Sequence, residues 1–260
     1  MPTVLAVPLP ALPEIQPTDD LAALIADAWR ELAAMDAELA PRKGDVLVVT
    51  QKIVSKAEGC LIDLTTIEPR PEAVAYAAQW DRDARQVEVV LRESAEIIRM
   101  QNGLVISRTK HGFVCANAGV DASNTGRGEW VTLLPDDADA SARAIRDGLA
   151  QRLALAPDDA PAVIVSDSFG RPWRFGIVDV ALGAAGIEPL IDLRDTPDAD
   201  GRIMHSTVVA VADEICSAAE LASGKTSGQP VVLVRGVEFT ARDMSVAQQV
   251  VMPASMDLFK

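Results

Sequence analysis

The stretch Asn117-Ala-Gly-Val-Asp-Ala-Ser-Asn124 decides how this chain is organised, because it places oxygen donors directly after a predicted strand. The apolar run Phe113 to Ala116 is typical of a short strand, and the turn Thr125-Gly-Arg-Gly128 cannot continue one. Small residues in the stretch let the backbone approach a ligand closely. Asp121 and Asn124 carry hard oxygen donors of the kind that Mg²⁺ and Mn²⁺ prefer. We therefore expect a binding site at the end of this strand.

A second stretch has the same organisation: Val163-Ile-Val-Ser-Asp-Ser-Phe-Gly-Arg-Pro-Trp-Arg174. Its apolar start predicts a buried strand, which ends at Asp167 and the hydroxyl of Ser168. Arg171 and Arg174 follow, and arginine recognises phosphate or carboxylate through two parallel hydrogen bonds. Two strand ends that each deliver a carboxylate and a neutral oxygen predict a metal–phosphate site.

Each of these pairs also has a plainer interpretation. Asp121 with Asn124 fits an Asx turn, and Asp167 with Ser168 fits a cap at a strand end. Taken singly, each pair is better explained in that structural way. The two pairs together, with the arginines beside the second, favour the metal–anion site.

Composition and charge set limits on the class of protein. The 260 residues are 49% apolar and 24% charged, which is ordinary for a globular protein with a large core. No apolar run reaches the ~20 residues of a membrane span, and the N-terminus has no basic region typical of a signal peptide. The formal net charge of −14 argues against nucleic acid as a partner. Three widely spaced cysteines indicate reduced thiols, so we expect a cytoplasmic protein.

The pattern of apolar residues predicts an α/β fold of mixed topology, with mixed sheets and packed helices, and neither a Rossmann nor a P-loop fold. We expect one domain over 1–260, with two subdomains that meet near 156–161. Thr18 is the predicted N-cap of the first helix. The predicted helices are 19–39, 71–87, 138–155 and 206–222, with 177–186 as a short helix or close-packed turn. The predicted strands are 4–9, 44–50, 89–91, 97–100, 163–167, 189–193 and 230–234, with a hairpin formed by 103–107 and 112–116.

Two polar loops are candidate phosphate sites. Residues 51–59 carry two lysines and a serine beside a strand end, although a solvated loop explains them better when they are taken alone. Residues 223–228 contain Gly224, Lys225 and Thr226 in the order typical of a Walker loop. However, the predicted helix precedes this loop and the strand follows it, which is the reverse of a Walker loop. Two interpretations of this loop remain: its amides and hydroxyls cover a bound nucleotide, or it is a C-cap turn that ends the helix at Gly224.

Three long motifs resemble the coenzyme F420-0:L-glutamate ligase family, also called F420 γ-glutamyl ligase. They are Gly44 to Gly59, Asn117 to Asn124 and Ser166 to Gly176, and the resemblance runs from about Leu12 to the C-terminus. Motifs of this length are specific. The resemblance implies an intertwined α/β homodimer. Some relatives carry a nitroreductase-like C-terminal domain, and we expect none here.

The resemblance also implies an activity. A member of this family uses GTP to add L-glutamate to coenzyme F420-0 and extends the γ-linked tail. The reaction passes through an acyl phosphate and releases GDP and phosphate. The implied cofactors are Mn²⁺ or Mg²⁺, with two ions bound, and K⁺. The implied partners are F420-0, L-glutamate and GTP, without nucleic acid or membrane.

Matching the motifs residue by residue assigns the site. The implied metal ligands are Asp121 and Asp167, with Ser168 beside the second ion. Lys56, Arg171 and Arg174 are the implied phosphate or carboxylate clamps, and we count them with the two aspartates as catalytic. The implied GTP contacts are Leu12, Pro13, Glu14, Ile15, Gln51, Lys52, Lys56, Asn124, Gly224, Lys225, Thr226 and Ser227. The family's last metal contact in the loop 223–230 has no clear counterpart, and no general base stands out.

Two alternatives remain open from the residues. The first is a metal-dependent ligase for another acidic acceptor, such as a folate-like polyglutamylase. The second is a nucleotide-binding module without catalysis, which would bind GTP and release no GDP when acceptor and glutamate are added.

Overall fold

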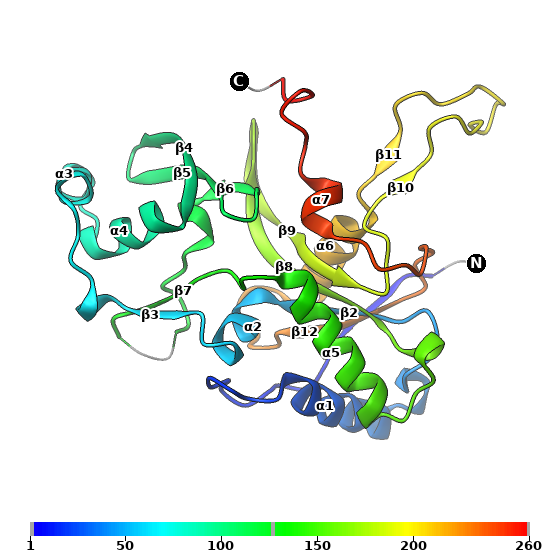
Figure 1. The fold of residues 1–260 in the computed structure, drawn as a ribbon. Coiled ribbons are helices and arrows are strands. Elements are labelled where there is room, and N and C mark those ends of the chain that lie inside the picture. Colours follow the sequence, from blue (N-terminus) through cyan, green and yellow to red (C-terminus); the bar gives the residue numbers. More distant parts are fainter. Residues whose placement is uncertain (1–2, 126–127, 259–260) are drawn as a thin grey trace.

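A five-stranded sheet forms the centre of the computed structural model, which describes residues 3–125 and 128–258 (Figure 1). The middle of the turn predicted at 125–128 lies outside these residues. The strands, in sheet order, are β1 (Leu5–Pro8), β12 (Val231–Arg235), β2 (Val46–Thr50), β8 (Ala162–Arg171) and β9 (Arg174–Ala185). The β2–β8 pair is parallel, and the other pairs are antiparallel. The predicted mixed α/β class is confirmed.

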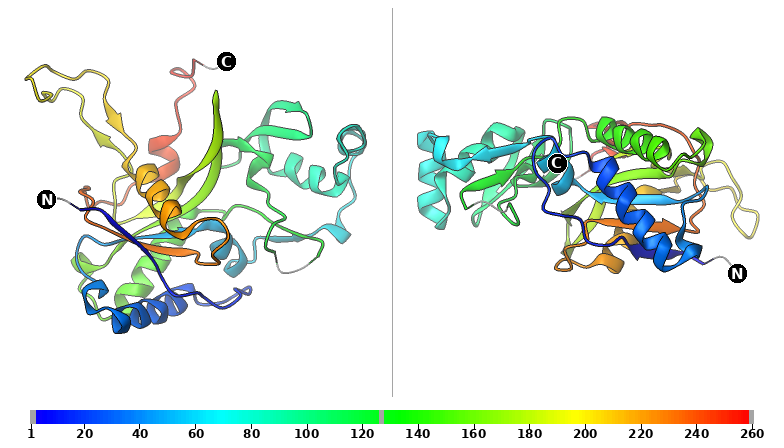
Figure 2. Two further views of the ribbon diagram at one scale, coloured as in Figure 1. Left: turned by 180° about the vertical axis from the view of Figure 1, so that it is seen from behind. Right: turned by 90° about the horizontal axis from the view of Figure 1, so that it is seen from below.

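Helices cover both faces of this sheet, so its central strands are buried on both sides. Helix α5 (Ala138–Arg152) packs on one face together with α1 (Leu21–Met35), and α6 (Val211–Ser223) covers the other (Figure 2). The apolar residues of β2 and the first half of β8 are nearly inaccessible to solvent. Continuous apolar runs of this kind are typical of strands that are buried on both faces. The short helix α7 (Val246–Val250) also contacts β9.

A smaller lobe, seen on the left of Figure 1, has a core of its own. Its core residues include Leu64, Val90, Val105 and Val131. Its three-stranded sheet consists of β4 (Ser94–Gln101), β5 (Leu104–Thr109) and β6 (Val114–Ala116), which includes the predicted hairpin. The remaining elements of the lobe are α3 (Pro71–Trp80), α4 (Ala84–Glu93), β3 (Leu61–Asp63) and β7 (Trp130–Thr132).

A two-stranded arm of β10 (Ile191–Asp192) and β11 (Val208–Val209) extends away from the central sheet (Figure 1). An acidic turn that carries Asp195, Asp198 and Asp200 lies in this arm. Within the described residues, no helix is both long enough and apolar enough to cross a membrane.

The helical predictions need three corrections. The first helix begins after Asp20, whose carboxylate accepts a hydrogen bond from the Ala23 amide at 2.9 Å, whereas the predicted cap Thr18 has a φ of 73°. The segment 71–87 is not one helix, because Asp81 adopts a left-handed conformation and ends α3. Asp83 then caps α4, which includes the residues predicted as a strand at 89–91.

The prediction of a helix or turn at 177–186 is also wrong, because residues 177–185 belong to β9. Their small side chains have a packing role. A Cβ atom on Gly183 would lie 2.1 Å from the backbone carbon of Ala138, at the start of α5. The strand therefore needs glycine where the helix crosses it, and the helix-like composition arises from this close approach.

Glu88 gives the smaller lobe a pH-dependent stability. Its buried carboxylate accepts hydrogen bonds from the guanidinium groups of Arg70 and Arg92, and these lower the pKa of Glu88 to about 2. A carboxyl whose pKa is lower in the folded state contributes stability above its unfolded value of 4.5. That contribution is lost as the pH falls from 4.5 toward 2.

We therefore expect Glu88→Gln to lower the melting temperature by several degrees at pH 7, since charge-assisted hydrogen bonds are lost. The difference from the wild type should shrink as the pH falls below 4.5. Thermal denaturation at pH 7, 4.5 and 3 measures this, with the exposed Glu31→Gln as the control. A difference that is equal at all three pH values contradicts the prediction.

Candidate functional site

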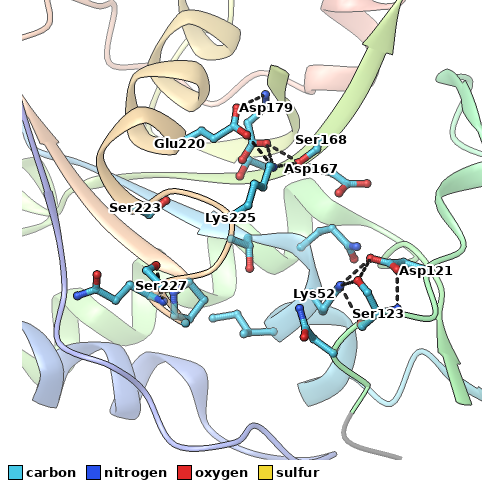
Figure 3. Close-up of a pocket in the computed structure, with 18 of the residues that line it drawn as sticks. Lys52, Asp121, Ser123, Asp167, Ser168, Asp179, Glu220, Ser223, Lys225 and Ser227 are labelled. Atoms are coloured by element: carbon cyan, nitrogen blue, oxygen red, sulfur yellow. Dashed lines mark hydrogen bonds and ion pairs between the residues drawn. The ribbon is translucent and has the colours of Figure 1, made fainter. Parts of the chain in front are cut away.

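A single cavity of about 910 Å³ brings together the motifs found in the sequence (Figure 3). Its wall is formed by the N-terminal loop at 12–15, helix α2 (Gln51–Ala57), the segment that follows β6, the β8–β9 hairpin and the loop between α6 and β12. The predicted loop at 51–59 is therefore mostly a helix, and it turns both of its lysines toward this cavity.

Most of the residues assigned to the site from the sequence line this cavity. Those that do are Leu12, Pro13, Glu14, Ile15, Gln51, Lys52, Lys56, Asp121, Asn124, Asp167, Ser168, Gly224, Lys225, Thr226 and Ser227. Arg171 and Arg174 do not. They pair with each other in the β-ladder at the tip of the β8–β9 hairpin, beside the exposed side chains of Trp173 and Phe175. Within one chain they are not placed as clamps.

Asp121 reaches the cavity through a tight backbone turn. Residues Asn117, Ala118 and Gly119 all have positive φ values near 52° to 73°, and a Cβ atom on Gly119 would lie 2.6 Å from the Leu134 side chain. Asp121 then bridges to Thr132, with backbone hydrogen bonds of 3.1 and 2.8 Å. The small residues of this motif therefore serve to turn the chain and pack it closely.

Lys52 holds the Asp121 carboxylate in place. Its ammonium nitrogen lies 2.6 Å from Asp121 Oδ2 and also donates to the backbone and hydroxyl oxygens of Ser123, at 2.9 and 2.8 Å. Burial acts to raise the pKa of Asp121, but the hydrogen bonds from Lys52 and Ser123 outweigh it, so this pKa is lowered. The Asp121 carboxylate is therefore ionised, and the ammonium group of Lys52 already lies beside it.

Two other residues of α2 are buried against the cavity. Lys56 is almost inaccessible, and its ammonium nitrogen lies 2.5 Å from Glu14 Oε1 on the N-terminal loop. The Ser55 hydroxyl oxygen lies 2.7 Å from Gln51 Oε1 and 2.6 Å from the carbonyl oxygen of Leu133. These contacts fix the helix between the N-terminal loop and the smaller lobe.

Among the residues that the structure describes, no ammonium group forms an ion pair with the Asp167 carboxylate. Burial and the nearby carboxylates of Asp179 and Asp121 raise its pKa to about 7, although the Ser168 amide opposes this. The neighbouring Ser166 is buried on the cavity wall, and its hydroxyl has no partner in the part of the chain that the structure describes. The strand does not end at Asp167, as the sequence predicted, but continues to Arg171.

Asp179 and Glu220 complete the site and were missed in the sequence. Asp179 lies directly opposite Ser168 in the β8–β9 ladder and accepts its hydroxyl hydrogen bond at 2.5 Å. Glu220 lies on the last turn of α6. Lys225 bonds both carboxylates, at 2.9 and 2.8 Å, and also the Ser168 hydroxyl. The only sequence signal for Asp179 was a lone carboxylate within an apolar run.

A β-bulge sets the register of this cluster. The ladder slips between Val165 and Ser166, so that two residues of β9 face one residue of β8 there. Asp213 on α6 accepts a hydrogen bond of 2.9 Å from the Ala181 amide next to the slip. Bulges re-aim side chains near functional sites, and this one precedes the Ser168–Asp179 pair.

The charge of the cavity is negative. The residues lining it include the five carboxylates of Glu14, Asp121, Asp167, Asp179 and Glu220, against the three ammonium groups of Lys52, Lys56 and Lys225. An anionic ligand would be repelled here unless a further cation came with it.

The carboxylates of Asp121 and Asp167 fit a divalent cation by their chemistry. Their oxygen atoms are the hard donors that Mg²⁺ and Mn²⁺ prefer, and a cation would stabilise the ionised form of Asp167. Among residues 3–125 and 128–258, no three His, Cys, Asp or Glu side chains converge into a ready-made metal cluster. A bound ion would therefore need further oxygen atoms from water or a ligand.

Comparison with known proteins gives one family. The family model described as F420-0:Gamma-glutamyl ligase matches residues 11–236. The matched region includes every residue that was assigned to the cavity from the sequence.

Individual relatives match almost the whole chain. A protein of Methanopyrus kandleri named coenzyme F420:L-glutamate ligase is 43% identical over 92% of this chain and 89% of its own length. A protein of the same name from Methanothermobacter thermautotrophicus is 41% identical over 96% of each chain. A third, from Halorubrum lacusprofundi, is 41% identical over 91% of this chain and 89% of its own.

Proposed function

The chain belongs to the F420-0:gamma-glutamyl ligase family, and from this premise we propose that it uses GTP to join L-glutamate to coenzyme F420-0. The proposal rests on the agreement between the family match and the geometry of the cavity. Relatives named for this ligation match nearly the whole chain, and the matched motifs line one cavity.

The proposed reaction proceeds in two steps. A carboxylate oxygen of F420-0 attacks the γ-phosphorus of GTP, the bond to the β-phosphate oxygen breaks, and GDP leaves. The amine of L-glutamate then attacks the carbonyl carbon of this acyl phosphate, and phosphate leaves as the amide forms. The amine loses one proton in this step. Repetition on the new γ-carboxylate would extend the tail.

The residues of the chain act in this proposal by positioning and electrostatics. Lys56 is held by Glu14 beside the N-terminal loop, where it can bind a phosphate group of GTP. Lys52 keeps the Asp121 carboxylate ionised and oriented. The loop at 223–230 closes another side of the cavity with amides and hydroxyls that can bind phosphate oxygens.

Asp121 and Asp167 would hold Mg²⁺ or Mn²⁺ in this proposal. The ion would supply neutralisation of the charge that develops on the phosphate oxygens during transfer. The proposal also includes a homodimer. Support for it comes from the hairpin tip, where the side chains of Trp173 and Phe175 are 81% and 108% exposed. Arg171 and Arg174 at this tip could then act on a second copy of the chain.

Mass spectrometry tests the proposed activity. The protein is incubated with F420-0, GTP, Mn²⁺ and L-glutamate, and we expect products heavier by one or more glutamyl units, with one GDP released for each unit. Two matched controls replace one substrate each: ATP in place of GTP, and D-glutamate in place of L-glutamate. GTP binding without any glutamylated product would instead favour a nucleotide-binding module.

We expect GTP binding itself to depend on a divalent cation, because the carboxylates of the cavity outnumber its ammonium groups. Bound triphosphate would add further negative charge beside Asp121 and Asp167. Isothermal titration calorimetry with GTP, at saturating Mg²⁺ and then with excess chelator, should show an affinity at least ~100-fold lower with chelator, about 2.7 kcal/mol. Equal affinities in both conditions would remove the metal ion from the proposed site.

A further inference from the structure

The ammonium group of Lys225 occupies a small oxygen-lined subsite inside the cavity (Figure 3). It lies 2.9 Å from Asp179 Oδ1 and 2.8 Å from Glu220 Oε1, and it donates to the hydroxyl of Ser168. These three oxygen atoms come from β8, β9 and α6, so three separate elements converge on one nitrogen atom. The three donors of a lysine ammonium can each be matched by one of them.

This arrangement is the one that a bound cation would have. Two carboxylates and a hydroxyl are hard donors, and two negative charges around one subsite need a positive charge among them. The backbone reinforces the cluster, because the Asp179 amide donates to Glu220 Oε2 at 3.3 Å and the Ser217 hydroxyl donates to the Asp179 carbonyl at 3.1 Å. The subsite is therefore held in place by its own elements.

Lys52, on the other side of the cavity, differs from Lys225 in its contacts. Two of the three oxygen atoms around its ammonium belong to Ser123, and only one belongs to a carboxylate. If a divalent ion binds Asp121, Lys52 keeps two neutral partners nearby. Lys225 has two carboxylate partners, and a metal ion could take its place only by displacing it from both.

We propose that the Lys225 ammonium is a built-in cation that takes the position of a second divalent ion at Ser168, Asp179 and Glu220. The inference rests on the proposed function and departs from the two ions that the family resemblance implies: each chain works with one divalent ion, held by Asp121 and Asp167. Lys225 then supplies the positive charge on the other side of the phosphate groups. Ser168 contacts this ammonium group in place of a metal.

Counting bound Mn²⁺ tests the proposal without measuring activity. The protein, carrying one equivalent of GDP, is titrated with Mn²⁺, and free Mn²⁺ is followed by electron paramagnetic resonance. We expect one bound ion per chain in the wild type and in Lys225→Arg, which keeps the positive charge. We expect two in Lys225→Met, because this change frees the three oxygen atoms and keeps the length of the side chain.

A second readout separates this role from a purely structural one. In Lys225→Met, the Mn²⁺ concentration that gives half-maximal glutamate addition should rise by about tenfold, as a dissociable ion replaces a tethered one. Lys110→Met is the matched control, because Lys110 also pairs with a carboxylate, that of Glu93, but does not line the cavity. It should change neither the count nor this concentration.

Three results would overturn the inference. Two bound ions per wild-type chain would show that the ammonium does not occupy a metal position. One ion in Lys225→Met, with only a lower melting temperature, would reduce Lys225 to a structural contact. No bound Mn²⁺ in any of the proteins would contradict the metal-dependent function proposed above, and this inference with it.

Discussion

Replacing Asp167 by asparagine is expected to lower the rate of glutamate addition by about a thousandfold at saturating Mn²⁺, or ~4 kcal/mol of transition-state stabilisation. The change keeps the size of the side chain and removes one negative charge from the proposed metal ligand. Asp167 is the carboxylate of the cavity whose ionised form is most in need of a cation, since burial and its acidic neighbours raise its pKa to about 7. Initial rates of GDP release and of glutamylated product measure the effect.

The same substitution should not harm the metal-free fold. The ordinary pKa of an aspartate is 3.8, and a pKa raised to about 7 in the folded state means that folding disfavours the ionised form. The wild type therefore loses stability as the pH rises from 3.8 to about 7, and asparagine avoids this loss. At pH 8 without metal, Asp167→Asn should melt at the same temperature as the wild type or higher. Saturating Mn²⁺ should raise the melting temperature of the wild type more than that of the variant.

The exposed Asp27→Asn is the control, because it removes the same charge from the outer surface of α1. It should leave both the rate and the metal-dependent stabilisation unchanged. If Asp167 were only a structural cap, the variant would melt several degrees lower and keep most of its rate. Retention of most activity at saturating metal would remove Asp167 from the proposed site.

The parts of this fold that follow from local patterns could be predicted from the sequence. The apolar runs at 44–50 and 230–234 are the buried strands β2 and β12, and the helix at 138–155 is α5 with three residues fewer. Asp121 and Asp167, which the two polar motifs singled out, both line one cavity. In these cases the local sequence pattern and the tertiary packing favour the same secondary structure.

The rest could not be predicted because tertiary packing decides it. The alanine and glycine residues of 177–186 resemble a helix, but they are small because α5 crosses β9 at Gly183. Asp179 and Glu220 enter the site only when β9 and α6 meet beside Ser168. No spacing within the sequence carries this information, since it depends on contacts between distant segments.

Arg171 and Arg174 were assigned to the site because they follow Asp167 closely in the sequence, but within one chain they do not line its cavity. A strand rises by about 3.3 Å per residue, so Arg171 lies roughly 13 Å along β8 from Asp167. The strand continues as the first half of a hairpin and carries both arginines to its tip. A loop after Asp167 would have allowed them to fold back over the cavity, and a strand does not.

The second large effect is expected for Arg235→Met, which should destabilise the whole fold. Arg235 at the end of β12 forms two hydrogen bonds to the fully buried Asp45, at 2.6 and 2.7 Å. Its guanidinium group also donates to the carbonyls of Glu38 and Ala40, at 2.5 and 2.8 Å. One side chain thus joins β12, the start of β2 and the segment after α1.

Removal of Arg235 leaves the Asp45 charge buried without its partner, which costs about 3–5 kcal/mol in other proteins. For a chain of this size we expect a melting temperature lower by about 10 °C. The control is Arg194→Met, because Arg194 pairs with Asp192 on the exposed arm, where ion pairs contribute little. Its melting temperature should stay close to that of the wild type.

The origin of the Arg235 effect can be separated from the loss of packing. The double variant Arg235→Met with Asp45→Asn removes the uncompensated charge, so it should recover part of the lost melting temperature. If the double variant melts no higher than Arg235→Met, the lower melting temperature comes from lost packing and from the two lost contacts with backbone carbonyls. Because β12 begins directly after the loop at 223–230, loosening this strand at its other end should also weaken GTP binding at temperatures where the protein is still folded. Calorimetry well below the melting temperature of the variant distinguishes this coupling from simple unfolding. Unfolding alone lowers the fraction of protein that binds GTP, but it leaves the affinity of the folded fraction unchanged.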